Sequence, residues 1–279
     1  MRRRRTLAGP VVFDGVGLHR GEPCRLVVAP REGQGYLLAR QGEEALVERL
    51  VTRGDERGTT LIFPGGARVQ TVEHLLAALR GLDIDDVRLS FDGPEPPVLD
   101  GGSALFAGRL LEAGIVEKEE AADVYSVPLP LVVQWGDRLA AALPGRGFQV
   151  TYVIDYENPL IGTRRLSLSM TPSTFMDRIA RARTFCLERD LEDLRSRGLA
   201  RGGTLENAVV VGEGAILNPG GLLYDDEFVR HKILDFVGDL ALLGCPLEGH
   251  FLAIAAGHDL HQALVERLRP FIVQGRVDS

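Results

Sequence analysis

The sequence FVRHKILDFVGDL occupies residues 228–240 and has the apolar spacing of an amphipathic helix. One side of this helix is apolar and contains Ile233, Phe236, Val237 and Leu240. The other side carries His231 and Asp235, which stand one helical turn apart. A neutral imidazole and an ionised carboxylate both bind divalent metals, so this pair could supply two ligands. The alternative is a solvated polar face in which the two side chains only pair with each other.

Two more ionisable residues, Lys232 and Asp239, flank the His/Asp pair. The helix therefore carries four ionisable side chains within residues 231–239, although its other members are mostly apolar. Burying that many charges is costly unless they serve a purpose. If the helix is buried, this side of it is predicted to be a functional site.

A second amphipathic helix is predicted over residues 70–79, with Thr71 as its N-cap. Its apolar positions are Val72, Leu75, Leu76 and Leu79. His74 projects away from that apolar stripe and directly follows Glu73. If His74 faces the downstream His/Asp pair, the chain has three metal ligands and an open fourth position, as catalytic zinc sites do. If His74 lies on the surface, the arrangement has no such meaning.

The composition is that of an ordinary globular protein, with 45% hydrophobic residues, 25% charged residues and a net charge of −7. A chain of 279 residues is long for one core and allows two domains of about 130 residues each. No apolar run is long enough to cross a bilayer, and the first residues lack the hydrophobic stretch of a secretory signal. We therefore expect a cytoplasmic protein without a transmembrane segment. No feature of the sequence argues for an obligate partner, so we expect a monomer.

Arginine fills positions 2–5. Such a block could contact nucleic acid or anionic lipid, but the net charge is acidic and no second basic block follows. We therefore expect an ordinary basic tip and no nucleic-acid partner. Cys24, Cys186 and Cys245 are odd in number and widely separated, so small buried hydrophobes are expected rather than disulfides or zinc ligands.

The predicted elements follow a similar order in the two halves of the chain. The first half contains the helices 70–79 and 104–113, a strand–turn–strand unit at 11–22, and the strands 24–29, 46–52, 59–63 and 87–91. The second half contains the helices 172–185, 228–240 and 260–268 and the strands 125–133, 138–143, 148–154, 166–169, 208–211 and 251–258. A charged connector at 117–120 separates them. We predict an α+β fold of two domains, residues 1–121 and 122–279, related by internal duplication.

Five motifs occur in the order and nearly the spacing of one known family. They are TVEHL at 71–75, PEPPVLDG at 94–101, ARTF at 182–185, the glycine pair at 202–203 and DEFVRHKILD at 226–235. Over essentially its whole length the chain resembles the UDP-3-O-acyl-N-acetylglucosamine deacetylases, the zinc amidases of lipid A biosynthesis. This resemblance implies two domains of similar topology, each a sheet layered against helices, with the active site in the cleft between them. It also implies an insert within about residues 187–223 that forms an apolar passage for a fatty acyl chain.

The resemblance assigns the metal site to His74, His231 and Asp235. Zn²⁺ is the expected ion, and Fe²⁺ is the other ion that such ligands hold. Water would occupy the fourth position, where the metal lowers its pKa. Glu73 resembles the general base of the family, and its position next to a metal ligand lets it reach that water without binding the metal.

Four further residues receive catalytic roles from the resemblance. His258 corresponds to a protonated histidine that stabilises the oxyanion or protonates the leaving amine, and Asp239 would hold its ring and raise its pKa. Thr184 corresponds to a hydroxyl donor to the oxyanion. Lys232 is similar to a lysine that contacts the diphosphate region of the substrate.

The expected substrate contacts also come from the resemblance. Phe185 and Tyr156 fall where the family places aromatic rings around uracil, and His19 lies near the nucleotide end. The residues expected along the substrate within the insert are Leu191, Leu194, Leu199, Gly203, Leu205 and Val209, and the alternative for the apolar ones is core packing. His250 and His261 match no family role, so we expect them on the surface.

The expected activity is removal of the N-acetyl group from UDP-3-O-(3-hydroxyacyl)-N-acetylglucosamine, which gives acetate and the free amine. A mononuclear iron oxygenase is an alternative, because two histidines and a carboxylate also describe its iron site. Glu73 and His258 argue against it, since an oxygenase needs no such acid/base pair. A non-catalytic nucleotide-sugar binding protein is the other alternative, and it would predict the loss of a ligand or of the base.

Overall fold

The structure is a computed structural model that describes residues 2–54 and 57–277, with side chains up to residue 272. The elements of the first half are β1 (Arg3–Leu7), β2 (Val11–Val16), β3 (Pro23–Pro30), β4 (Tyr36–Arg40), β5 (Glu43–Leu46), the 3₁₀ turn η1 (Val47–Arg49), β6 (Val51–Gly54), β7 (Thr59–Ile62), β8 (Arg68–Gln70), α1 (Glu73–Gly81), β9 (Val87–Phe91), α2 (Ala104–Glu112) and β10 (Ile115–Ala121). Those of the second half are β11 (Tyr125–Ser126), β12 (Leu131–Trp135), β13 (Arg138–Leu143), β14 (Phe148–Ile154), β15 (Arg164–Ser169), α3 (Pro172–Arg178), β16 (Thr184–Leu187), η2 (Glu188–Asp190), α4 (Leu191–Ser196), β17 (Ala208–Val211), α5 (Glu227–Leu240), η3 (Ala241–Leu243), β18 (Leu247–Ile254) and α6 (His258–Val277).

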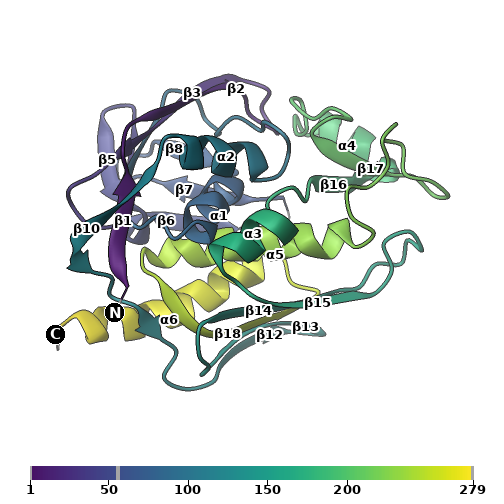
Figure 1. Cartoon of the computed structure of the whole chain (residues 1–279). Coiled ribbons are helices and arrows are strands. Elements are labelled where there is room, and N and C mark those ends of the chain that lie inside the picture. Colours follow the sequence, from purple (N-terminus) through teal and green to yellow (C-terminus); the bar gives the residue numbers. More distant parts are fainter. Residues whose placement is uncertain (1, 55–56, 278–279) are drawn as a thin grey trace.

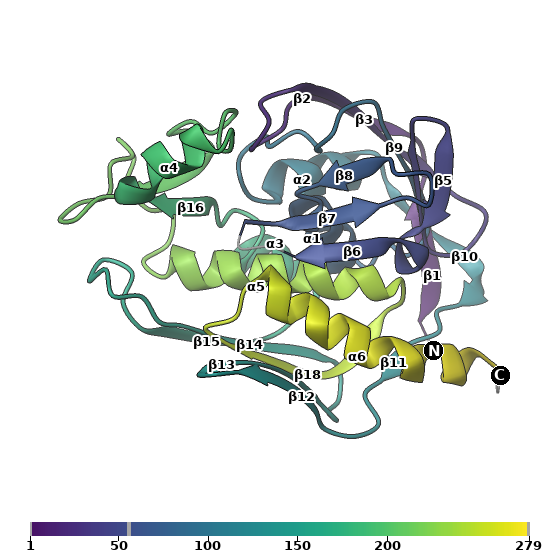
Figure 2. The ribbon, with the colours of Figure 1, turned by 180° about the vertical axis from the view of Figure 1, so that it is seen from behind.

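The elements form layers, with helices in the middle and a sheet on each outer side (Figures 1 and 2). Helices α1 and α2 lie under the sheet of the first half, and α5 and α6 lie on the sheet of the second half. The two helical layers meet where α1 packs against α5. This mixture of antiparallel sheets and helices confirms the predicted α+β class.

The largest sheet of each half is paired in the same way. The first sheet has the order β2-β3-β9-β4-β5 and is antiparallel except between β9 and β4. The second has the order β12-β13-β18-β14-β15, and the two-residue strand β11 also pairs with β18. It is antiparallel except where β18 pairs with β14 and with β11. In both sheets the central strand comes late in its half, after the helix that packs at the middle of the molecule.

The core is continuous through the middle layers. Every residue of α1 is buried, and α5 is buried along nearly its whole length because it lies between α1, α6 and the second sheet. The apolar face predicted for residues 228–240 forms part of this core. None of the helices described combines the length and the apolar character that a membrane span needs.

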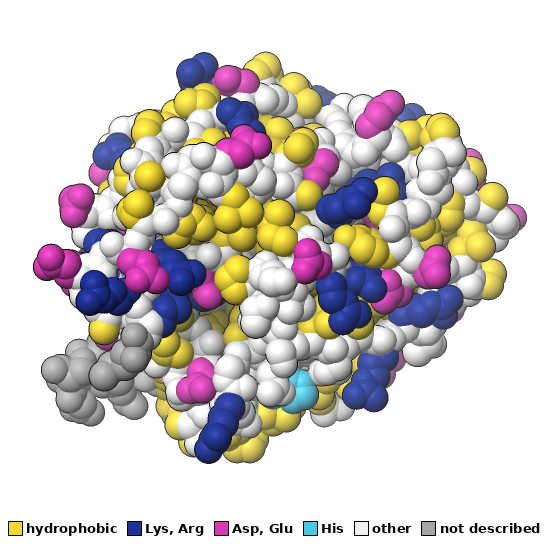
Figure 3. All heavy atoms as spheres, viewed as in Figure 1, with side chains coloured by type: hydrophobic (Ala, Val, Ile, Leu, Met, Phe, Trp, Pro, Cys, Tyr) yellow, Lys and Arg dark blue, Asp and Glu magenta, His cyan; other side chains and the backbone are white. Residues whose placement is uncertain are grey.

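The arginine block at the start is not an exposed tip, because residues 3–7 form β1, which pairs with β10. Arg4 is only 1% exposed and binds Asp86 through two nitrogens, at 2.9 and 2.5 Å. Asp86 also accepts hydrogen bonds from Lys118 and from the backbone N–H of Gly35. The expectation of a basic tip was therefore wrong. On the side of the molecule seen in Figure 1, charged side chains of both signs are mixed (Figure 3).

Three local predictions were also wrong. The connector expected at 117–120 is part of strand β10, whose pairing with β1 uses its backbone. The strand expected at 46–52 is interrupted by the 3₁₀ turn η1. Thr71 does not cap α1, because the N-cap position is held by Val72. Thr71 precedes it in a turn with a φ of 55°, and its hydroxyl donates to Glu95 instead of to the helix.

The helix expected at 172–185 ends at Arg178, and strand β16 begins at Thr184. The backbone between them is used by neighbouring elements, since the carbonyls of Ala180 and Ala182 accept hydrogen bonds from the N–H of Ser103 and from His231. Because these carbonyl oxygens bind other elements, they do not accept the hydrogen bonds that would continue the helix. At the other end of the second half, the strand expected at 251–258 is β18, which starts and ends four residues earlier, and α6 extends well beyond 268.

Candidate metal centre and active site

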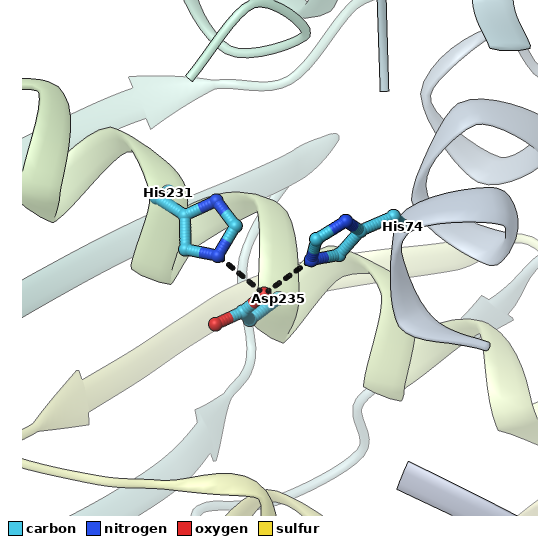
Figure 4. Close-up of side chains that lie close together, drawn as sticks. All are labelled: His74, His231 and Asp235. Atoms are coloured by element: carbon cyan, nitrogen blue, oxygen red, sulfur yellow. Dashed lines mark ion pairs between the residues drawn. The ribbon is translucent and has the colours of Figure 1, made fainter. Parts of the chain in front are cut away.

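Three predicted metal ligands lie together in the buried centre of the molecule (Figure 4). His74 comes from α1, and His231 and Asp235 come from α5. Nε2 of His74 lies 3.5 Å from Oδ1 of Asp235, and Nε2 of His231 lies 3.3 Å from the same oxygen. The sequence left open whether His74 would face the helical pair, and it does.

Close packing of two helices brings these side chains together. Gly238 on α5 sits against the backbone of α1, where a Cβ atom would lie 2.1 Å from the carbonyl oxygen of Glu73. A side chain at this position would force the helices apart. On the other side of α1, the hydroxyl of Ser103 donates to the carbonyl oxygen of His74 at 2.7 Å.

The donor set fits a divalent cation. Burial lowers the pKa of His231 to about 3, so its imidazole is neutral, and its Nδ1–H donates to the Ala182 carbonyl, which leaves the Nε2 lone pair available. Burial alone would raise the pKa of Asp235, but His231 and Lys232 hold that pKa well below its usual range. Oδ1 of Asp235 is buried without a hydrogen-bond donor, whereas Oδ2 accepts from Lys232 at 2.8 Å. Two histidine nitrogens directed at an anionic oxygen that lacks a donor are what a metal ion would satisfy.

Glu73 lies beside the ligands and is 2% exposed. Burial raises the pKa of its carboxyl group to about 7, against the opposing effect of His258 and His74. Its Oε2 accepts a hydrogen bond from the backbone N–H of Thr59 at 3.1 Å. A carboxyl group with this pKa can both take and release a proton near neutral pH.

His258 starts α6 and reaches the same place from another direction. Its Nδ1 contacts Oδ2 of Asp239 at 2.7 Å, and its Nε2 lies 3.7 Å from Oδ2 of Asp235. Burial lowers a histidine pKa, but the carboxylates of Asp239, Glu73 and Asp235 together outweigh it, Asp239 most, and raise the pKa of His258 to about 9. His258 is therefore positively charged at neutral pH, with Nε2 toward the ligands.

The prediction that His261 lies on the surface was wrong. Its side chain is fully buried, with Nδ1 at 2.8 Å from Oδ2 of Asp239 and Nε2 at 2.9 Å from the hydroxyl of Tyr152. The sequence held a usable signal, because a residue three positions after His258 lies on the same face of a helix. His250 is half-buried and contacts Thr151 at 2.8 Å, so it is not a free surface residue either.

A cavity of about 440 Å³ opens onto this cluster. The predicted site residues that line it are His19, Glu73, Tyr156, Thr184, Phe185, Leu191, Gly203, Leu205, His231, Lys232, Asp235 and His258. His74 and Asp239 are outside that lining and contact it through Asp235 and His258. The cavity therefore extends from the cluster of ionisable side chains to residues of the insert.

The part of the cavity within the insert is mostly apolar, although Asp190 and Arg195 also line it. Its walls come from β16, α4, β17 and the loops beside them, with Leu187, Leu191, Leu194, Leu205, Ala208, Val210 and Leu217. Two of the expected lining residues are elsewhere. Val209 is fully buried in the core, because the alternation of β17 turns it away from Ala208 and Val210, and Leu199 lines a neighbouring polar cavity instead.

Aromatic rings stand next to the ligands. The ring centroids of Tyr156 and Phe185 are 5.7 Å apart, and Nζ of Lys232 lies 5.8 Å from the Phe185 centroid. The backbone N–H of Thr184, the residue before Phe185, donates to the carbonyl of Gly101 at 2.8 Å, which fixes β16 against the loop of the PEPPVLDG motif.

His19 also lines the cavity, and it is held at both ring nitrogens. Nε2 contacts the carbonyl of Arg57 at 3.2 Å, and Nδ1 accepts from the backbone N–H of Ala200 at 3.4 Å. The backbone N–H groups of His19 and Arg20 both donate to Oε2 of Glu95 at 3.0 Å. The buried glutamate of the PEPPVLDG motif therefore anchors the loop that carries His19.

Comparison with known proteins gives a consistent result. The sequence model of one family, described as UDP-3-O-acyl N-acetylglycosamine deacetylase, matches residues 4–269. The UDP-3-O-acyl-N-acetylglucosamine deacetylase of Anaeromyxobacter dehalogenans is 44% identical over 270 residues, which cover 95% of this chain and 87% of that protein. The enzyme of the same name from Myxococcus xanthus is 42% identical over 272 residues, covering 95% of this chain and 86% of that protein.

Proposed function

The chain belongs to the UDP-3-O-acyl-N-acetylglucosamine deacetylase family, and we propose that it hydrolyses the N-acetyl group of UDP-3-O-(3-hydroxyacyl)-N-acetylglucosamine to the free amine and acetate, the committed step of lipid A biosynthesis. One structural observation carries this proposal. A cluster of metal-ligating and acid/base side chains borders a cavity that the insert lines mostly with apolar side chains. An amide next to a fatty acyl chain has the shape and polarity that such a cavity accepts.

We assign the metal to His74, His231 and Asp235, and we propose that it is Zn²⁺. Amide hydrolysis involves no change of oxidation state, so a metal without redox chemistry suffices. Fe²⁺ is the alternative, because two histidines and one carboxylate also hold that ion. When bound, the ion lowers the pKa of water and polarises a carbonyl oxygen.

The side chains around that position supply the proton transfers. Glu73 is assigned as the general base that removes a proton from the attacking water, and its raised pKa keeps that proton exchangeable. His258 is assigned as the general acid that protonates the leaving nitrogen, and Asp239 keeps it charged. The hydroxyl of Thr184, at the wall of the same cavity, is assigned to stabilise the oxyanion.

The two ends of the substrate differ in polarity, and the cavity does as well. We propose that the acyl chain lies along Leu191 and Leu205 in the insert, where burial of each CH₂ contributes about 0.8 kcal/mol. Lys232 is proposed to contact the diphosphate, and Phe185 and Tyr156 to pack against uracil. His19 and Gly203, also at the cavity wall, are proposed to contact the substrate.

The alternatives are less well supported. An iron oxygenase has no use for a base and an acid beside the metal ligands, and Glu73 and His258 both line the cavity with His231 and Asp235. A non-catalytic binding protein would not need to retain Glu73 together with all three ligands, yet all four are buried in one cluster.

The proposal is tested by metal analysis of the freshly purified protein together with an acetate-release assay on the UDP-sugar. About one equivalent of zinc and release of one acetate per substrate are expected. His231→Ala should lose both the metal and the activity, whereas His250→Ala, a matched change at a half-buried histidine outside the cavity, should keep both. A full equivalent of metal in His231→Ala would remove this residue from the ligand set, and an absence of acetate release by the parent protein would remove the activity.

A further inference from the structure

Thr59 is a buried residue that contacts the proposed general base. It is the first residue of β7 in the first half of the chain, its side chain is fully buried, and it lies against Glu73. The residue before it, Gly58, passes so close to Glu73 that a Cβ atom would lie 2.9 Å from Oε1 of that carboxyl group. The chain at 58–59 therefore forms part of the immediate surroundings of the proposed base.

The backbone and the side chain of Thr59 contact different groups. Its backbone N–H donates to Oε2 of Glu73 at 3.1 Å. Its hydroxyl lies 2.5 Å from Oδ1 of Asp239, and the amide of Gln262 donates to the hydroxyl oxygen at 3.0 Å. The Asp239 carboxylate can only accept, so the single hydroxyl proton of Thr59 must be donated to Asp239.

Asp239 is thereby held at both oxygens. Oδ1 accepts from Thr59, while Oδ2 is contacted by His258 at 2.7 Å and by His261 at 2.8 Å. A carboxylate with donors at both oxygens cannot rotate about its last bond without losing one of them. The orientation of the His258 ring, which depends on Oδ2, therefore depends on the hydroxyl of Thr59.

We propose that Thr59 is a positioning residue that fixes the general base and the general acid relative to each other, an inference that rests on the proposed deacetylase function. Through its backbone it orients Glu73, and through its hydroxyl it orients Asp239 and with it His258. Glu73 and Thr59 belong to the first half of the chain, and Asp239 and His258 to the second. This residue thus connects the acid/base groups across the junction of the two halves.

The test uses Thr59→Val, which removes the hydroxyl, keeps the backbone N–H and nearly preserves the volume. We expect kcat for acetate release to fall about 10- to 100-fold, with KM and bound zinc within about twofold of the parent. Thr59→Ser, which restores the donor, should regain most of kcat. Thr60→Val is the matched control, because Thr60 is the next residue of β7, strand alternation places it on the opposite face from Thr59, and it lines the neighbouring polar cavity instead of the one that holds Glu73 and His258.

Three results would overturn the proposal: kcat of Thr59→Val within about twofold of the parent, an equal loss in Thr60→Val, or loss of zinc in parallel with kcat. If Thr59→Val does not fold, Gln262→Leu replaces it, since it removes the amide that holds the hydroxyl. A lower kcat with full zinc then supports the proposal, and an unchanged kcat contradicts it. Failure of the deacetylase function itself is seen separately, as no acetate release by the parent protein.

Discussion

Glu73 and His258 are buried at the same cavity, yet burial and charge act on them in different proportions. For Glu73 the removal of water is the largest effect, and it raises the pKa to about 7. For His258 burial is also the largest single effect and lowers the pKa, but the carboxylates of Asp239, Glu73 and Asp235 together outweigh it, and the pKa rises to about 9. Between these two values the carboxyl group is ionised while the imidazole is protonated. That is the pair of states that a base and an acid need at the same moment.

Replacing Glu73 by Gln tests the base directly. The amide keeps the size of the side chain but cannot take a proton, so kcat should fall about 10²- to 10⁴-fold. Bound zinc should be unchanged, because Glu73 is not among the proposed ligands. Steady-state kinetics with metal analysis measures both, and Glu120→Gln, at an exposed position, is the control. Activity within about threefold of the parent would remove Glu73 from this role.

The pH profile of kcat/KM should be bell-shaped. Activity rises with pH through about 7 as Glu73 loses its proton, and it falls through about 9 as His258 loses its own. Asp239→Asn removes the charge that raises the pKa of His258, so its basic limb should move to lower pH while the acidic limb changes less. A basic limb that stays in place in this variant would contradict the assignment of His258.

Single residues differed in how far the sequence alone could identify them. His231 and Asp235 were accessible because helical spacing is local. His74 could be predicted as a candidate ligand from its position on a helix. Its proximity to α5 could not be predicted, because it depends on how the two helices pack. Thr59 had no signal, since a threonine at the start of a short strand becomes functional only through contacts with residues far away in the chain. For His261 a signal existed in its spacing from His258, but the surface was expected.

The crossing of α1 and α5 is the central contact between elements. Glycine in a helix costs about 1 kcal/mol relative to alanine, so a glycine at 238 needs a reason. The reason is the approach of Glu73 to within 2.1 Å of where a Cβ atom would be. Both helices were predictable from their apolar periodicity. The crossing of the two helices could not be predicted. The end of α3 could not be predicted either, because the backbone after it forms hydrogen bonds with residues of other elements.

Gly238→Ala should separate the two helices and damage the metal centre. We expect a loss of about 1–3 kcal/mol in the free energy of unfolding, together with weaker zinc binding. Gly108→Ala on α2 is the matched control, because its added Cβ meets nothing within 4 Å, and it should be neutral or stabilising. Denaturant unfolding and zinc titration measure the two effects. Equal behaviour of the two variants would show that the close approach at Gly238 is unimportant.

In the molecule as a whole, the two large sheets lie on either side of shared helices. The equal pairing order of the two large sheets supports a division into residues 1–121 and 122–279, which we propose as two domains related by duplication. The similar order of elements in the sequence pointed to this, although the small sheets β1-β10 and β6-β7-β8 were not foreseen as units. Short strands with charged residues carry little periodic signal, and their pairing is decided by distant partners.

Removal of the proposed metal should destabilise the whole protein, because the ligands we propose for it come from both halves. An ion at 100 to 1,000 times its Kd adds about 2.7–4.1 kcal/mol to the folded state. For a chain of this size, chelation should lower Tm by about 5 to 15 °C. Differential scanning fluorimetry with and without chelator measures this, and added zinc should restore Tm in the parent but not in His231→Ala. Equal Tm values for the parent in both conditions would show that the ion does not bind the folded chain.

The complete burial of α1 has a consequence for synthesis in the cell. His74 leaves the ribosome long before α5, which covers it in the finished protein. Until α5 is synthesised, the nascent chain exposes an apolar helix together with Glu73 and His74, whose partners on α5 do not yet exist. A chaperone that shields this segment during translation would raise the yield of active protein. A fragment that stops at Ala121 would precipitate instead of acquiring zinc.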